Sequence, residues 1–451
     1  KKDSVEKIIQ ELRGEKVKLR EDIAYSLRIK KIREEEKQLE KQKEKILEKV
    51  KKTVPERIKL MVVYDYFYDL LKENQVQAVT GLSRFTFYLE GWVKKDDIPS
   101  LQKAISEFPQ VTAIVKKPAA KEKSQIPVAL TNRKIFKPFE LVTELYGLPR
   151  YLEIDPTPFL APFFAIFLAL CLTDGGYGIL LAIFSFLIPR KMQVGEGGKK
   201  LFSMLFISGI ATVAIGTVTG GIFGVELQKL PAFLSPLKKL ALFNPMQQPM
   251  IFLVIALAIG VVHLLTGIIL EMVDNLRHKD IATAFLDQFS WIIVILGLVL
   301  VALPYGKNFI SQGSAGGETS LPLTLSPSQI LLLLMEMPLY SQVGFFMAVA
   351  GIITLFLFKG RRSRNIAKRL AKGAYEVYGI IQLFADVLSY SRLLALGLAT
   401  SVIATVVNTI ASMAGAAPFI GPVMAVFILI LGHIGNLLIN ALSGFIHTAR
   451  L

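Results

Sequence analysis

The sequence contains a single cysteine, Cys171, among its 451 residues. One cysteine can form neither a disulfide framework nor a cysteine-ligated metal site within the chain. The patterns GxxxxGK[ST], HExxH and CxxC are also absent, and GEGGKK at 195–200 departs from the first of them. We therefore expect no metal, no cofactor and no catalytic site here. If ATP drives the function, it is bound by another chain.

Apolar residues make up 52% of the sequence and are concentrated after Pro156, whereas residues 1–135 are rich in Lys and Glu. This asymmetry predicts a soluble domain followed by a polytopic membrane domain. The net charge of +16 is spread over a helical stalk and the short loops between apolar runs. Because basic loops are typical of membrane proteins, we expect no nucleic-acid partner.

Residues 1–53 predict a long coiled-coil stalk helix, since they contain no proline and are rich in strong helix formers. A narrow apolar seam on this charged segment calls for a partner helix, although a solvated single helix is the alternative. The chain starts without Met and ends inside a helical pattern, so we expect both ends to be truncated. The seam consists of Val5, Ile9, Leu12, Leu19, Ile23, Ile46 and Val50.

Residues 54–118 predict a small α/β lobe. RFTFYLEGWV at 84–93 alternates in the manner of a strand, 95–108 has helical spacing, and 111–117 predicts a second strand. The proline-containing stretch 119–156 is expected to be an extended linker to the membrane.

Residues 157–451 predict a mostly α transmembrane domain of eight helices. The first apolar block, 157–189, would span roughly 50 Å as one helix, so two short helices fit a ~30 Å core better. Two crossings there also place the basic loops 190–200, 277–279 and 359–372 on one side, which gives both chain ends a cytoplasmic location. Glycines within 209–224 predict close helix packing. The other apolar blocks are about 201–225, 249–273, 283–304, 328–358, 377–414 and 419–451.

The last two blocks are too long for upright helices. Residues 377–414 would extend about 57 Å as one helix, so we expect this helix and the final one to lie steeply tilted. In the final helix, polar residues recur at spacings of 3, 4, 3, 4 and 3, which places them on one face. Polar helix packing is one reading of this stripe, and a water- or ion-conducting face is the one we favour. The stripe consists of His433, Asn436, Asn440, Ser443, His447 and Arg450.

Arg392 lies within FADVLSYSRLLALG at 384–397, deep in an apolar run. A membrane arginine costs about 2.5–3.5 kcal/mol on insertion scales, so it needs a carboxylate or water nearby. Asp386 is six residues earlier and on another side of the helix, so the counter-charge is expected from another chain. Asp174 lies in the outer turn of the first hairpin, where a plain polar turn is equally compatible.

His263 and Glu271 share one flank of an apolar helix. An interfacial charge is the alternative for Glu271, which lies near the expected cytoplasmic end.

Five segments together resemble subunit a, also called subunit I, of rotary V-type and archaeal A-type ATPases. The resemblance runs from about Thr53 to the end of the chain. The segments are FTFYLEGWV, PVALTNRKIFKPFELVTELYGLPRYLEIDPTPFLAPFF, LTDGGYG, VLSYSRLLALGLA and GFIHTARL.

The resemblance implies a membrane stator with two offset half-channels for H⁺ or Na⁺, beside a rotating ring of carboxylate-bearing subunits. Arg392 matches the family's essential arginine and Arg450 its second arginine, with His447 one turn from it. By depth, Asp174 and His263 would belong to the outer half-channel, and we expect Glu271 and Asp386 towards the cytoplasm.

The implied partners are the proteolipid c-ring, peripheral stalk subunits, a central-stalk socket subunit, the soluble ATPase sector and membrane lipid. The implied location is a membrane, most simply the cell membrane of a prokaryote. A secondary ion transporter with a cytoplasmic coiled-coil accessory domain is the alternative. It predicts inverted repeats, and no repeat relates the two halves of the sequence.

Overall fold

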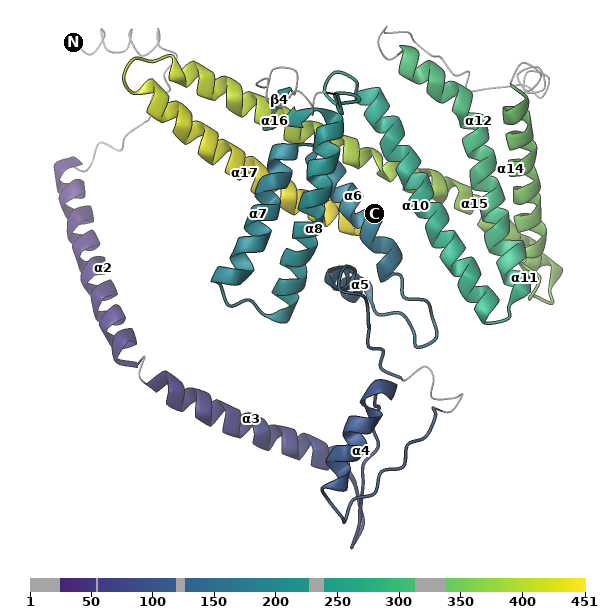
Figure 1. Cartoon of the computed structure of the whole chain (residues 1–451), viewed down its shortest axis with the longest axis horizontal. Helices are drawn as coiled ribbons and strands as arrows, with labels where there is room; N and C mark the ends of the chain where they lie inside the picture. The colour runs from purple at the N-terminus through teal and green to yellow at the C-terminus, as the bar shows by residue number, and fades with distance from the viewer. Residues whose placement is uncertain (1–24, 54–55, 119–125, 227–238, 313–337) are drawn as a thin grey trace. The chain divides into compact units, whose positions relative to one another are not determined.

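The computed structural model describes residues 25–53, 56–118, 126–226, 239–312 and 338–451 (Figure 1). The chain divides into two compact units, Lys1–Val115 and Lys116–Leu451, and each is described by itself. Most of the predicted seam of the stalk, from Val5 to Ile23, lies outside the described residues, as does the loop 313–337.

The first unit is built from two long helices and a small hairpin. Its elements are α2 (Tyr25–Thr53), α3 (Arg57–Val79), β1 (Gly81–Leu82), β2 (Phe87–Tyr88), η2 (Lys95–Asp97) and α4 (Ile98–Ser106). Ile46 and Val50 of the predicted seam are 61% and 52% exposed. The partner helix that would cover them stays a prediction.

The strands predicted for this unit are mostly absent from its described residues, whereas the small α/β lobe as a domain stays a prediction. Of the strand expected at 84–93, only Phe87–Tyr88 is a strand, paired with Gly81–Leu82, and residues 111–117 form none. A strand exists only where a neighbour accepts its hydrogen bonds, and β1–β2 is the one strand pair in the described part of this unit. The alternation of apolar and polar residues at 84–93 does not reveal whether a neighbouring strand is present.

The second unit is a helical assembly, and the predicted mostly α fold is confirmed. Its first half contains η3 (Lys137–Phe139), α5 (Glu140–Tyr146), α6 (Thr157–Leu172), α7 (Gly175–Lys191), α8 (Glu196–Thr219), β3 (Gly221–Ile222) and β4 (Val225–Glu226). Its second half contains α10 (Pro249–Arg277), α11 (Ile281–Thr283), the π-helix η6 (Ala284–Phe289), α12 (Ser290–Gln312), α14 (Leu339–Phe358), α15 (Ile366–Ser389), α16 (Ser391–Gly415) and α17 (Gly421–Arg450).

Six helical stretches in the described part of the chain are long and apolar enough to cross a membrane, and α6 is a shorter apolar helix. The block 157–189 forms two helices, as its length predicted, because Thr173 adopts a left-handed conformation and Asp174 begins α7. The count of eight crossings stays a prediction.

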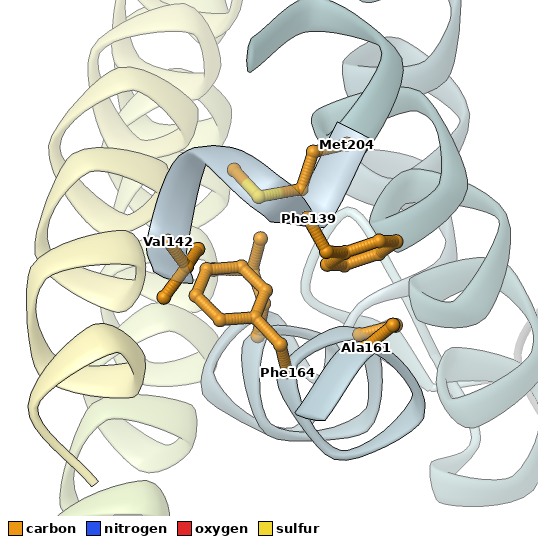
Figure 2. Close-up of a cluster of buried hydrophobic side chains, with 7 residues drawn as sticks. Phe139, Val142, Ala161, Phe164 and Met204 are labelled. Carbon is orange, nitrogen blue, oxygen red and sulfur yellow. The ribbon is translucent and has the colours of Figure 1, made fainter. Parts of the chain in front are cut away.

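The segment predicted to be an extended linker is partly folded onto the helices. Figure 2 shows Phe139 and Val142 packed with Phe164 of α6 and Met204 of α8. The rings of Phe139 and Phe164 lie 5.9 Å apart, edge to face. The linker prediction relied on the prolines and overlooked a short amphipathic helix. Phe139 and Val142 are three residues apart and therefore share one helical face.

Helices α7 and α8 pack backbone to backbone through glycines, which confirms the predicted close packing. A Cβ atom on Gly209 would lie 2.9 Å from the backbone nitrogen of Ala182. A Cβ atom on Gly178 would lie 2.7 Å from the backbone nitrogen of Val213 and 2.9 Å from the oxygen of Gly209. Since these obstacles are backbone atoms, they cannot rotate away.

Gly178→Ala is therefore expected to destabilise the protein by about 1–3 kcal/mol through overpacking. The measurement is the midpoint of thermal unfolding in detergent. Gly197→Ala is the matched control, because a Cβ atom there meets nothing within 4 Å. Equal midpoints for the two variants would contradict the close α7–α8 contact.

The helical stretch predicted over 377–414 begins earlier than expected and contains one turn residue, Tyr390. Helix α15 begins at Ile366, and a turn at Tyr390 separates it from α16. Around this turn, the Tyr390 nitrogen donates to Val387 O and the Leu393 nitrogen to Tyr390 O, which are tighter i→i−3 bonds. Helix α17 is continuous over Gly421–Arg450, and it runs with α16 obliquely to α7 and α8 (Figure 1).

Candidate functional site

The first three residues of the polar stripe on α17, His433, Asn436 and Asn440, lie in one hydrogen-bonded network. Asn436 Nδ2 donates to the Tyr177 hydroxyl of α7 at 2.8 Å, and that hydroxyl lies 2.7 Å from His433 Nδ1. On the other side of the ring, His433 Nε2 lies 3.1 Å from Oδ1 of Asn408 in α16. Asn440 Nδ2 donates to the Asn436 backbone oxygen at 2.9 Å and also to its side-chain oxygen.

Each side chain in this network donates to the next, from Asn440 of α17 to the backbone oxygen of Phe223. Asn408 Nδ2 donates to the backbone oxygen of Phe223 at 2.7 Å, so its Oδ1 faces His433 and accepts from Nε2. In a neutral ring Nδ1 then accepts from the Tyr177 hydroxyl, whose oxygen accepts from Asn436. Asn436 and Asn440 are only 3% and 6% exposed. This half of the stripe is thus closed by helix-to-helix hydrogen bonds.

The other half of the stripe is open. Ser443 and His447 are half-buried and Arg450 is exposed. His447 Nδ1 is buried and has no hydrogen-bond partner among the residues that the structure describes. A buried polar atom without a partner costs about 1–3 kcal/mol, so such atoms are normally satisfied by water, an ion or another chain.

Arg392 lies in the first turn of α16 and is also unsatisfied. Its Nη1 atom is buried without a hydrogen-bond partner in the described ranges of the chain. Its neighbours Tyr390 and Leu393 are buried in a cluster with Cys171 of α6, whose thiol lies within electrostatic range of the guanidinium. Among the described residues no ion pair joins Arg392 to a carboxylate, Asp386 included. The cation therefore lacks a counter-charge within this part of the chain.

The turn before Arg392 is held by α10. His263 Nδ1 lies 2.7 Å from the Tyr390 hydroxyl, and the His263 ring packs against Phe163 and Phe167 at centroid distances of 4.8 and 5.3 Å. Gly260 leaves room for the Tyr390 ring, which a Cβ atom there would meet at Cε2 within 2.8 Å. His263 thus positions the Tyr390 turn, and its role in a half-channel stays a prediction.

Asp174 is 2% exposed, and among the described residues all its hydrogen-bond donors are backbone groups. Its Oδ1 accepts from Gly176 and Tyr177 at the start of α7, at 2.8 and 3.2 Å, and also from Phe223 at 2.8 Å. Its Oδ2 accepts from Gly224 at 2.8 Å. The carboxylate therefore caps α7 and clamps the β3–β4 hairpin, which favours the structural reading of this residue. A role in conducting ions stays untested.

Glu271 and Asp386 lie apart from these groups. Glu271 is exposed and accepts from Gln288 Nε2 of the π-helix at 3.1 Å. Asp386 is exposed on α15, one turn before Tyr390. In the described part of the chain, no hydrogen bond or ion pair connects either carboxylate with Arg392 or with the α17 network.

Sequence reasoning missed three residues that organise the site: Tyr177, Asn408 and Tyr390. Asn408 is a polar residue within a long apolar helix, a signal that the sequence did carry. Tyrosines in apolar helices carry no such signal, because their rings pack like other aromatic residues. Within the described residues, no cluster of three or more His, Cys, Asp or Glu side chains could hold a metal ion.

Comparisons with known proteins agree on one family. The model of the V-type ATPase 116 kDa subunit family matches residues 2–211. A-type ATP synthase subunit I of Methanocaldococcus jannaschii is 33% identical over 87% of this chain and 56% of that protein, and the Pyrococcus abyssi subunit is 32% identical over 85% and 54%. V-type ATP synthase subunit I of Chlamydia pneumoniae is 24% identical over 81% of this chain and 57% of that protein. The chain thus spans about half the length of these relatives.

Proposed function

Because the chain belongs to the V-type ATPase 116 kDa subunit family, we propose that it is the membrane stator subunit of a rotary ATPase. In this role it is not catalytic. It carries H⁺ or Na⁺ through two offset half-channels to and from the carboxylates of a rotating proteolipid ring, while other subunits bind ATP. The peripheral stalks, the central-stalk socket subunit and the soluble ATPase sector complete the assembly.

The observation that carries this proposal is the buried Nη1 atom of Arg392, which has no partner among the described residues. Arg392 as a whole is half-buried, but a buried guanidinium nitrogen without a partner is costly, so we infer that a group outside the described residues pairs with it. Ala395 and Ala399 lie one and two turns further along α16 and are exposed. Such small side chains let a foreign helix approach closely. A ring helix that brings a carboxylate to Arg392 satisfies both observations.

The difference between the hydrogen-bonded half and the open half of the α17 stripe indicates where ions could enter. The side chains of Asn436 and Asn440 donate hydrogen bonds within the protein, whereas the buried Nδ1 atom of His447 has no hydrogen-bond partner among the described residues. We assign the ion-accessible face to Ser443, His447 and Arg450. Arg392 separates the half-channels by favouring an ionised ring carboxylate beside it. Each ion that crosses contributes about 2.3 kcal/mol per 100 mV, so several ions must cross for each ATP.

The proposed topology has eight crossings, with the first unit and the end of α17 in the cytoplasm. Basic residues at both ends of the α7–α8 connection and at the start of α15 support this orientation.

Cysteine accessibility tests the ion pathway, because the sole natural cysteine, Cys171, is only 1% exposed. In the assembled complex in sealed vesicles, Ser443→Cys and His447→Cys are expected to react with a charged methanethiosulfonate reagent about tenfold faster than Asn436→Cys. The reason is that the thiolate forms only where water reaches it. The rate of thiol modification is the measurement.

Leu442→Cys is the matched control on the neighbouring face of α17, since Leu442 is 63% exposed but belongs to an apolar surface. It should react slowly, because the lipid or the ring covers that face. If neither Ser443→Cys nor His447→Cys reacts from either side of the membrane, the proposed pathway is wrong. A secondary transporter would instead show ion flux with the isolated chain in vesicles, without the ring or the ATPase sector.

A further inference from the structure

A shallow, largely open hollow with basic lining residues lies on the surface between the end of α14 and the start of α15. It has a volume of about 590 Å³. We call it the α14–α15 cavity. Its lining residues are Lys359, Lys368, Ala371, Lys372, Tyr375 and Glu376.

Glu376, the carboxylate among the described lining residues, is already paired within the protein. Lys359 Nζ lies 2.8 Å from Glu376 Oε1, which also accepts a hydrogen bond from Trp291 Nε1 at 2.9 Å. Lys368 and Lys372 are exposed, and within the described ranges no carboxylate pairs with them. They lie four residues apart on one face of α15, so both ammonium groups are available to a ligand.

Two nearby arginines, by contrast, are paired with carboxylates. Arg361 donates to Asp287 at 2.7 Å, and Arg362 forms an ion pair with Asp280. Hydrogen bonds from Thr283, and then the charge of Arg362, hold the pKa of Asp280 below its usual range, so that partner is ionised at neutral pH. Lys368 and Lys372 are therefore the lining cations that have no carboxylate partner among the described residues.

The cavity lies at a boundary between apolar and polar sequence. The membrane-length helix α14 ends at Phe358, directly before Lys359. Along α15, Tyr378 and Ile381 follow Tyr375 towards the apolar part of the helix and are 63% and 61% exposed. Cations beside exposed tyrosine and aliphatic side chains are typical of the layer where phospholipid headgroups meet acyl chains.

We propose that the α14–α15 cavity binds the phosphate headgroup of an anionic phospholipid. Lys368 and Lys372 contact the phosphate, the Tyr375 hydroxyl donates to it, and an acyl chain lies along Tyr378 and Ile381. The charge of two unpaired lysines matches an anionic headgroup, and the adjoining apolar surface matches a lipid tail rather than a free anion. This inference goes beyond the proposed stator function and does not depend on it.

The test uses the whole complex in phosphatidylcholine nanodiscs with a trace of photoreactive phosphatidylglycerol. After illumination, peptide mass spectrometry maps the labelled residues. Labelling is expected within residues 359–381 and should fall when unlabelled phosphatidylglycerol is added. In K368Q/K372Q it should drop about tenfold or more, because each lysine near a membrane surface contributes substantially to anionic-lipid attraction. K368R/K372R should retain it.

K191Q/K199Q is the matched control, since Lys191 and Lys199 are exposed lysines in another basic connection between apolar helices. It should leave the labelling of 359–381 unchanged. Equal labelling by photoreactive phosphatidylcholine, or no effect of K368Q/K372Q, overturns the proposal. Displacement by millimolar inorganic phosphate would identify a free-anion site instead. Labelling that appears only after another subunit is removed would identify a protein-binding surface and also overturn it.

Discussion

Arg392→Ala is expected to lower ATP-driven ion transport by about a hundredfold or more. Removing one partner of a desolvated ion pair costs about 3–5 kcal/mol, and each 1.36 kcal/mol is a factor of ten. In this protein the remaining partner is the proposed ring carboxylate, because Arg392 has none among the described residues. The measurement is ATP-dependent acidification, or Na⁺ uptake, in vesicles that carry the whole complex.

Two further variants separate charge from geometry. Arg392→Lys keeps the positive charge but loses the planar guanidinium, so it should retain part of the transport. Arg277→Ala removes an exposed arginine at the end of α10 and should leave transport unchanged. ATP-driven pumping that survived in Arg392→Ala, in a complex with normal subunit composition, would contradict the proposed function.

Asp174→Ala is expected to destabilise the protein by about 3 kcal/mol or more. The change leaves four backbone N–H groups without their acceptor, those of Gly176, Tyr177, Phe223 and Gly224. An unsatisfied buried donor costs about 1–3 kcal/mol, although the four costs do not simply add. The measurement is the midpoint of thermal unfolding in detergent, together with the yield of assembled complex.

Asp174→Asn tests the same idea with a smaller change. Its amide oxygen can keep the three bonds that Oδ1 makes, and asparagine is a good helix N-cap, so only the bond from Gly224 is lost. We expect a loss of about 1–2 kcal/mol. Glu196→Ala, an exposed carboxylate at the start of α8, is the control. Normal stability of Asp174→Ala with lost transport would instead favour a direct role in ion conduction.

The sequence alone predicted those features that depend on length, periodicity and charge. The block 157–189 had to form two helices, because one would be too long for a bilayer core. The heptad spacing from His433 to Arg450 put the polar residues on one face of α17, since α-helical geometry fixes that relation. The depth of Arg392 in an apolar run, with Asp386 on another side of the helix, predicted a counter-charge from another chain, and this stays a prediction.

Tertiary structure decided what each of these residues meets. Only the positions of Tyr177 and Asn408 divide the stripe into a closed half and an open half. Only the β3–β4 hairpin turns Asp174 from a turn residue into a clamp. The physical reason is that periodicity reports which way a side chain points, whereas its hydrogen bonds depend on groups brought close by packing, often more than a hundred residues away in the chain.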